Sequence, residues 1–172
     1  MKSRILAIIV ILGSFGLLTY LRLNEPKQPS AYQIGGSETV RRGEDLKTAA
    51  SGFKAYNIGA TRISLAENTT LTLEDTSTNT PKLAMREGRV ITTGPVDISV
   101  RDTTVHATGT MSFIFYSWLD KLDVVDITNK AAYSVDTLHN VTTPELYNFN
   151  PSASSARTFY EWALSSNNTQ PK

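Results

Sequence analysis

The chain offers few side chains for catalysis or metal binding. It contains no cysteine and only two histidines, His106 and His139, in 172 residues. Disulfides, thiol nucleophiles and cysteine-ligated metals are therefore excluded, and a site with several histidine ligands is disfavoured. On a strand, His106 would point to the face opposite its apolar neighbours Val105 and Ala107. We expect both histidines to be ordinary surface residues.

The acidic residues do not form a recognisable catalytic or metal-binding pattern. A Ser-His-Asp set could include His106 and Asp102, but the sequence has no Gly-x-Ser-x-Gly segment to present the nucleophile. Asp120, Asp123 and Asp126 recur every three residues. On a strand, Asp123 and Asp126 point to opposite faces, which argues against a shared cation. We predict a protein that is not an enzyme and has no metal or cofactor.

The most distinctive segment is aromatic. Residues 113–119 read FIFYSWL, so both faces of a strand here would carry large side chains. One interpretation is a central strand covered on both faces, for instance by a C-terminal helix carrying Tyr160 and Trp162. A second is an exposed surface with Tyr116 and Trp118 as anchors for a partner, and a third is a sugar-stacking platform whose polar partners the sequence does not assign. We expect Trp118 in the core and Tyr116 partly exposed.

The elements that must position these rings are predicted to be strands. From Thr39 to Thr143 the chain is rich in threonine, valine, isoleucine and aromatic residues, which favour strands. Apolar and polar residues alternate in short runs, and turn signals recur about every 8–12 positions. This pattern predicts an all-β fold, either a two-sheet sandwich or a β-helix-like coiled sheet of short strands. The expected inward-facing residues are Val96, Ile98, Val100, Val105, Phe113 and Phe115, whereas Asp97 and His106 are expected to face solvent.

Two segments lack this alternation. Residues 37–54 are polar and weakly patterned, which favours a strand followed by a short helix. Near the end, Asn150 and Pro151 form a helix-cap and first-turn pair. We predict a short C-terminal helix over residues 151–165, followed by a polar tail. The residues expected on its apolar face are Ala153, Ala156, Tyr160, Ala163 and Leu164.

The N-terminal region is predicted to be a membrane anchor. Ile5 to Leu21 form an uncharged run of seventeen residues that follows Lys2 and Arg4. A membrane-spanning helix needs about 17–25 residues, and the basic residues favour a cytoplasmic N-terminus. A cleaved signal peptide is an alternative, although the residues after the run are bulkier than its cleavage site requires. A buried core helix is a further alternative.

The domain organisation follows from these segments. We predict an anchor over residues 1–23, a proline- and glycine-containing spacer over 24–37, a β domain over 38–148, and the C-terminal helix and tail over 149–172. Beyond residue 23 the chain has 14 of its 17 basic residues against all 16 acidic ones. No nucleic acid partner is expected, because binding of the phosphate backbone depends on an excess of basic side chains.

A succession of strands and turns within residues 60–127 is recognisable. A strand pair, ATRISLAENTTLTLED, is followed by LAMREGRV, by VDISVRDTTVHATGTMSFIFY and by LDVVDI. This order resembles the FecR-type extracytoplasmic domain family, over about residues 46–135. In that resemblance, Gly88 belongs to a Gly-x-Val turn, and Gly109 and Thr110 precede the aromatic strand. The resemblance implies that these three residues are structural turn positions without a chemical role. The residues themselves lead to a similar expectation: Gly88 and Gly109 mark a tight turn or a close approach of strands, and the Thr110 hydroxyl can satisfy a turn backbone group.

The resemblance also implies a place in the cell and a class of function. Only about four residues precede the apolar run, which is too few for the cytoplasmic sigma-factor-binding region of signalling members of the family. We therefore expect a single-pass bacterial inner-membrane protein, anchored through Ile5 to Leu21, with its domain in the periplasm. Its expected role is to bind or scaffold an envelope protein or a cell-wall component. The alternative is a bitopic β-jellyroll carrier of lipopolysaccharide, which would need an open apolar trough where a binding module has a filled core.

Overall fold

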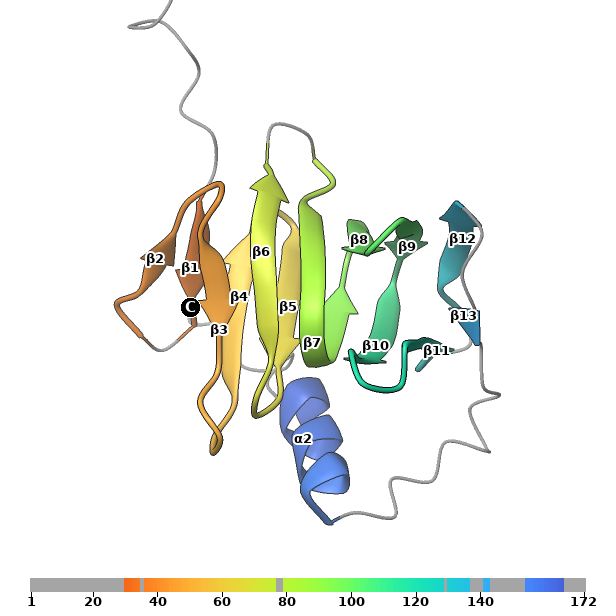
Figure 1. Cartoon of the computed structure of the whole chain (residues 1–172). Helices are drawn as coiled ribbons and strands as arrows, with labels where there is room; N and C mark the ends of the chain where they lie inside the picture. Colours follow the sequence, from red (N-terminus) through yellow and green to blue (C-terminus); the bar gives the residue numbers. More distant parts are fainter. Residues whose placement is uncertain are drawn as a thin grey trace, which may run out of the picture.

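A computed structural model describes residues 30–34, 36–76, 79–128, 130–136, 141–142 and 154–165. The described residues form thirteen strands and one short helix, so the all-β prediction is confirmed (Figure 1). The strands are β1 (Ala31–Gln33), β2 (Thr39–Val40), β3 (Asp45–Lys47), β4 (Lys54–Ile58), β5 (Thr61–Leu65), β6 (Thr70–Asp75), β7 (Lys82–Thr93), β8 (Val96–Val100), β9 (Thr103–Thr108), β10 (Thr110–Tyr116), β11 (Lys121–Asp126), β12 (Ala132–Asp136) and β13 (Val141–Thr142), and the helix is α2 (Ser154–Ser165).

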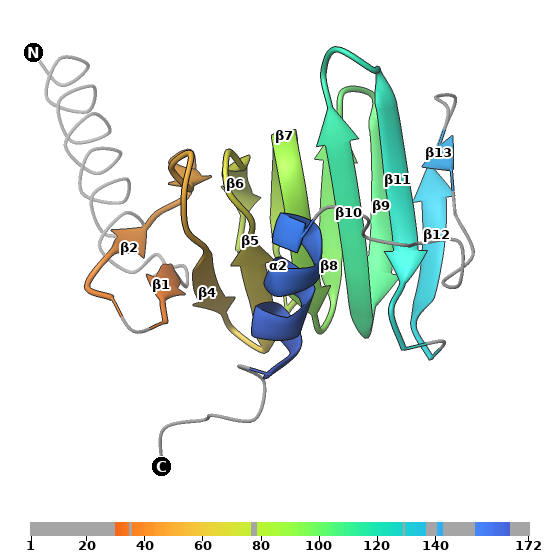
Figure 2. The same cartoon turned by 90° about the horizontal axis from the view of Figure 1, so that it is seen from below.

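The long strand β7 belongs to two ladders of strands. Its first half pairs with β6 and, in parallel, with β8, and its second half pairs antiparallel with β5 and β10. One ladder therefore runs β3-β6-β7-β8-β9-β12, and the other runs β2-β1-β4-β5-β7-β10-β11-β13. Figure 2 shows β10 and β11 in front of β8 and β9, so the two ladders form two layers that meet at β7.

The inner faces of both ladders contribute to one hydrophobic core. On β8, buried and partly buried residues alternate, as the period-two pattern predicts. Asp97 and His106 lie on the opposite, outer face and are partly exposed. Six residues predicted to face inward are all 4% exposed or less, and they are Val96, Ile98, Val100, Val105, Phe113 and Phe115.

The β domain begins earlier than predicted. Ala31 is completely buried, and β1 pairs with both β2 and β4, so the spacer prediction of residues 24–37 is wrong from β1 onward. A strand of three residues is too short to produce a visible alternation among prolines and glycines. The short helix predicted within residues 37–54 is also wrong. This segment contains β2 and β3 instead, and burial of Leu46 in the hydrophobic core stabilises β3 against the sheet.

The predicted anchor, Ile5 to Leu21, lies outside the described residues. In the part of the chain that the structure describes, no helix is both long and apolar enough to cross a membrane.

The C-terminal helix α2 packs on the outer face of the second ladder. Phe159 and Ala163 are buried there against Ala66 and Ile91, and the Tyr160 hydroxyl donates a hydrogen bond of 2.6 Å to Ser112 on β10. The strand β10 is thus covered on both faces. This arrangement agrees with the first interpretation of the aromatic segment, a central strand covered in part by a C-terminal helix.

The predicted apolar face of α2 is only partly correct. Tyr160 and Ala163 do contact the sheet, whereas Leu164 is 38% exposed and Phe159 takes the central position instead. Burial raises the pKa of Tyr160 to about 12. Its phenol therefore stays protonated at neutral pH and able to donate to Ser112.

Candidate functional site

Tyr116 and Trp118 form an exposed pair of rings at the end of β10. Their ring centroids lie 6.2 Å apart, with 40° between the ring planes. Tyr116 is half-buried, as expected, but Trp118 is 75% exposed, so its predicted place in the core is wrong. The physical reason is the turn that begins at Ser117. This turn ends the strand alternation and directs the indole outward.

The turn that carries Trp118 is held in place by several contacts. The backbone amides of Leu119 and Asp120 both donate to the Tyr116 carbonyl, at 3.0 and 3.1 Å. Asp120 also forms an ion pair of 2.5 Å with Arg101, whose guanidinium lies 5.9 Å from the centre of the Phe115 ring. These contacts order the backbone of the turn from which the Trp118 ring projects.

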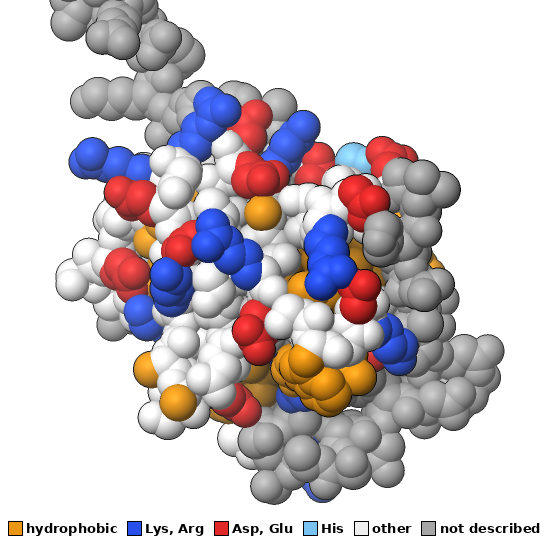
Figure 3. All heavy atoms as spheres, in the orientation of Figure 1, with side chains coloured by type: hydrophobic (Ala, Val, Ile, Leu, Met, Phe, Trp, Pro, Cys, Tyr) orange, Lys and Arg blue, Asp and Glu red, His pale blue; other side chains and the backbone are white. Residues whose placement is uncertain are grey.

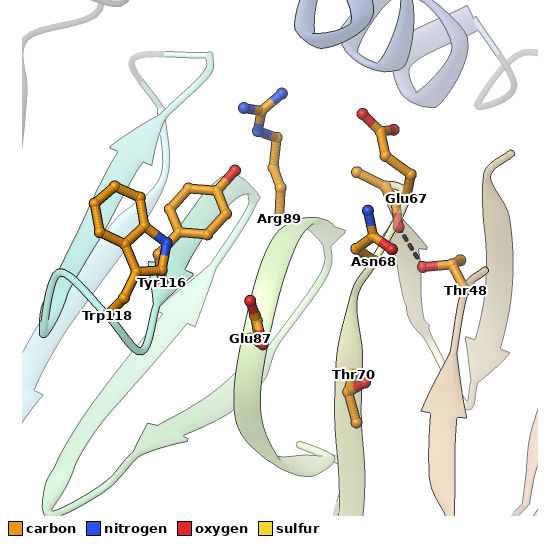
Figure 4. Close-up of a pocket in the computed structure, with 9 residues that line it drawn as sticks. Thr48, Glu67, Asn68, Thr70, Glu87, Arg89, Tyr116 and Trp118 are labelled. Carbon is orange, nitrogen blue, oxygen red and sulfur yellow. Dashed lines mark hydrogen bonds between the residues drawn. The ribbon is translucent and has the colours of Figure 1, made fainter. Parts of the chain in front are cut away.

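A hollow of about 540 Å³ lies beside this pair. Four segments line it: Thr48 just after β3, the β5–β6 turn with the first residue of β6, the middle of β7, and the end of β10 with the turn that follows (Figure 4). Ala66, which packs under α2, also lines it, so the hollow starts where the cover of the helix ends. We call this site the aromatic hollow, defined by Glu67, Asn68, Glu87, Arg89, Tyr116 and Trp118.

A close approach at Gly88 brings the β5–β6 turn against β7. Gly88 lies inside β7, at the point where the strand passes from one ladder to the other. The predicted turn at Gly88 is therefore wrong, but the alternative of a close strand approach is confirmed, because a side chain there would lie 2.6 Å from the Cα atom of Thr69. The buried Thr69 hydroxyl accepts a hydrogen bond of 3.1 Å from the Arg89 amide. The Thr48 hydroxyl accepts one of 3.0 Å from the Thr69 amide and donates to the Ala66 carbonyl. These bonds fix the position of the β5–β6 turn, which carries Glu67 and Asn68, relative to β7, which carries Glu87 and Arg89.

The other two predicted turn positions lie elsewhere. Gly109 is the single residue between β9 and β10, with φ of 91°, and a side chain there would come within 3.0 Å of Ala131. The Thr110 hydroxyl lies 3.4 Å from that of Thr93, and does not bond to a turn backbone group as predicted. Neither residue lines the aromatic hollow.

The polar side chains of the aromatic hollow are not paired with one another. The buried Nε atom of Arg89 has no hydrogen-bond partner among the residues that the structure describes. The side chains of Glu67, Asn68 and Glu87 likewise have no hydrogen bond or ion pair to any part of the described chain. Figure 4 shows Arg89 between the two rings and Glu67. The hollow thus combines an aromatic wall with hydrogen-bond donors and acceptors that no other described residue uses.

A second polar cluster surrounds His106 on the other ladder. Its two ring nitrogens lie 2.8 Å from carboxylate oxygens, Nδ1 from Asp97 on β8 and Nε2 from Asp136 on β12. The outer-face position predicted for His106 is confirmed, whereas neither carboxylate partner was predicted. The turn at Arg101 and Asp102 was the available signal, because a two-residue hairpin there sets Asp97 opposite His106.

This cluster is poorly suited to catalysis. When both ring nitrogens of His106 are engaged by carboxylates, neither has a lone pair with which to deprotonate a hydroxyl. Asp102, the partner considered from the sequence, belongs to the turn between β8 and β9. Within the described residues, no group of three or more histidine or carboxylate side chains could hold a metal ion. His139 lies outside those residues.

The His106 cluster predicts a pH-dependent contribution to stability. The hydrogen bond to Asp136, and next the one to Asp97, raise the pKa of His106 above its ordinary value of 6.5. Because the pKa of His106 is higher in the folded state than in the unfolded state, its protonation stabilises the fold. This stabilisation is complete below about pH 6.5 and is lost as the pH rises through the raised pKa of the folded state. The melting temperature should therefore fall between pH 6 and pH 8.5 by more in the wild type than in His106→Gln.

The expected size is small, because the His106 side chain is 40% exposed and solvent screens the pair. Such exposed pairs contribute about 1 kcal/mol or less, and salt should weaken this one further. His139 is present in both proteins, so its titration cancels in the comparison. Parallel melting profiles for the wild type and His106→Gln would contradict the prediction.

The surface around the aromatic hollow carries both signs of charge. Figure 3 shows acidic and basic side chains intermixed on this face, with hydrophobic side chains gathered over the β10–β11 turn. Trp118 and Leu119 are the exposed large hydrophobic residues of that turn, at 75% and 51%. A continuous basic track of the kind that follows a nucleic acid backbone is not visible on this face.

Comparison of the chain with models of protein families, with curated proteins and with solved structures gives no match. The resemblance to FecR-type domains therefore stays a prediction that depends on the residues themselves.

Proposed function

We propose that this protein is a non-catalytic binding module of the bacterial cell envelope. In this proposal, Ile5 to Leu21 hold it in the inner membrane and its β domain, a two-sheet sandwich of the FecR type, stands in the periplasm. The observation that carries the proposal is the aromatic hollow, where a 75% exposed tryptophan lies beside polar side chains that pair with no other described residue. Large aromatic residues on a fixed turn are characteristic of binding surfaces.

The arrangement of acidic and basic groups supports binding over catalysis. His106, on the other ladder, has both ring nitrogens engaged by carboxylates and so offers no free nitrogen as a base. Glu67 and Glu87 are the carboxylates that line the aromatic hollow, and Figure 4 shows them on different sides of it.

The packing between the two ladders supports a binding module over a lipid carrier. A carrier needs an open apolar trough, and the inner residues here are instead closely packed, with Leu71, Leu83 and Phe113 fully buried. The aromatic hollow lies outside this core and is lined mainly by polar residues. The alternative of a lipopolysaccharide carrier thus receives no support from the described part of the chain.

One prediction of this proposal concerns the location of the β domain. Alkaline phosphatase, which is active only outside the cytoplasm, is expected to be active and membrane-bound when fused after residue 30. The reason is that Lys2 and Arg4 favour a cytoplasmic N-terminus and the uncharged run after them is long enough to span. An inactive fusion would contradict the orientation. An active fusion found in the soluble fraction would overturn the anchor and leave export standing.

Another prediction of this proposal concerns binding through the aromatic hollow. The immobilised full-length protein should retain a component of solubilised envelope fractions, and Trp118→Ser should abolish that retention. Because Trp118 is 75% exposed, the same change should alter the free energy of unfolding by less than about 0.5 kcal/mol. Retention is measured by comparing what the two immobilised proteins hold after washing, and stability by urea unfolding.

Tyr32→Ser is the matched control, since Tyr32 is also an exposed aromatic residue, at 59%, and does not line the hollow. It should retain the same component as the wild type. Loss of retention in both variants would show nonspecific aromatic contact, and unchanged retention in Trp118→Ser would show that the hollow is not the binding site.

A further inference from the structure

We infer that the ligand of the aromatic hollow is a saccharide. This inference names the ligand class of the proposed binding module and so rests on the proposed function. It assigns the two rings to the apolar face of a sugar. It assigns the side chains of Glu67, Asn68 and Arg89, which have no hydrogen-bond partner among the described residues, to the hydroxyl and carbonyl or carboxylate groups of the sugar.

The ring pair fits the apolar face of a pyranose. A pyranose presents a patch of C–H groups on one face and hydroxyl groups around its edge, and such patches stack on the negative face of an aromatic ring. Trp118 and Tyr116 are tilted by 40°, with centroids 6.2 Å apart. They form a shallow angled wall and not a closed slot, so adjacent units of a chain could lie along it. The contacts of Asp120 with Arg101 and of its amide with Tyr116 hold this wall in place.

The polar side chains supply the hydrogen bonds that a stacked sugar needs. Glu67 accepts from hydroxyl groups, Asn68 both donates and accepts, and Arg89 donates through a planar fork. Asn68 has φ of 53°, in the left-handed region, and its amide donates 3.0 Å to the Ala49 carbonyl, so the turn that carries it is fixed. Arg89 lines the hollow, and its planar guanidinium favours a ligand with a strong acceptor, either an amide carbonyl or a carboxylate.

Other ligand classes fit the aromatic hollow less well. An extended peptide adds to the free edge of a sheet, whereas at the hollow β7 is already paired with β6 up to Glu87 and with β10 from Gly88 onward. A nucleotide could stack on the rings, but a phosphate monoester, with a charge of about −1.5 to −2, would face two carboxylates, Glu67 and Glu87, against the single guanidinium of Arg89, whereas a neutral amide carbonyl or a single carboxylate adds less negative charge. A lipid chain would leave all of these polar groups unpaired.

The test begins with a glycan array that includes N-acetylated, uronic-acid and purely hydroxylated oligosaccharides. The full-length protein is kept in a detergent without a sugar headgroup, so that the detergent does not compete for the hollow. Binding is then titrated by tryptophan fluorescence in a Trp162→Phe background, where Trp118 is the one remaining tryptophan of the chain. Oligosaccharides with an amide carbonyl or a carboxylate should bind and shift the Trp118 emission.

Variants assign the binding to the hollow. Trp118→Ala, read by calorimetry, and Arg89→Gln should each weaken binding at least about tenfold, the equivalent of about 1.4 kcal/mol. Arg89→Lys, which keeps the charge but not the fork, should recover only part of the loss. The matched controls are Tyr32→Ala, an exposed ring elsewhere, and Arg86→Gln, an exposed arginine on the same strand that does not line the hollow. Both should bind within about twofold of the wild type.

The outcomes separate this inference from the proposed function. If no oligosaccharide binds while Trp118-dependent retention of envelope material persists, the saccharide assignment is overturned and the binding module stands. Binding that survives both Trp118→Ala and Arg89→Gln would overturn the site. Cleavage of a bound oligosaccharide would overturn the non-catalytic part of the proposed function. If the wild type neither binds any oligosaccharide nor retains envelope material, both proposals are overturned.

Discussion

Replacing Gly88 by alanine is expected to lower the free energy of unfolding by about 2–6 kcal/mol. Gly88 has φ of 113°, and a side chain there would lie 2.6 Å from the Cα atom of Thr69. The strained backbone should cost about 1–3 kcal/mol, and the overpacking should add about 1–3 kcal/mol. The upper part of this range approaches the whole stability of a typical domain, about 5–15 kcal/mol. Urea unfolding of the purified protein gives the measurement.

Gly52→Ala separates the two causes. Gly52 has a similar φ of 100°, but its added side chain would meet no atom within 4 Å. This control should therefore show the backbone cost alone. A Gly88→Ala loss no larger than that of Gly52→Ala would mean that the close approach to Thr69 is not needed for stability. Because Thr69 also positions the β5–β6 turn, Gly88→Ala protein that still folds should bind its ligand more weakly.

The sequence predicts which residues are buried better than it predicts which strands are neighbours. Alternation in VDISV and in the strand after it was enough to place Val96, Ile98 and Val105 in the core. It could not show that β7 continues from one ladder into the other, nor that its first residues pair in parallel with β8. Those pairings join residues that are far apart in the sequence, and local periodicity does not indicate which distant residues pair.

The candidate site was predicted from the sequence only in part. Tyr116 and Trp118 were identified, but hydrophobicity alone placed Trp118 in the core, because the pattern did not show that the strand ends at Ser117. The polar partners Glu67 and Arg89 come from elements that meet only through the approach of Thr69 to Gly88. A glycine inside a strand pattern was the one signal of that approach, and the resemblance placed it at a turn.

Truncation of Phe113 to alanine is expected to cost about 3–5 kcal/mol. Phe113 is completely buried at the centre of β10, between Val90 on β7 and Val124 on β11. Its ring belongs to the core that both ladders share, so its loss leaves a cavity that neighbouring strands cannot easily fill. The change should lower the urea midpoint without altering the dependence of unfolding free energy on urea.

Trp118→Ala is the matched control for this truncation. It removes a larger ring only five residues further along the chain, from a position that is 75% exposed, and should cost less than about 0.5 kcal/mol. The two variants should therefore separate stability from binding: Phe113→Ala should unfold readily yet bind while folded, and Trp118→Ala should be stable and fail to bind. Comparable losses of stability in both would mean that the turn at Ser117 does not expose the indole. The aromatic segment would then belong wholly to the core, and the aromatic hollow would lose its wall.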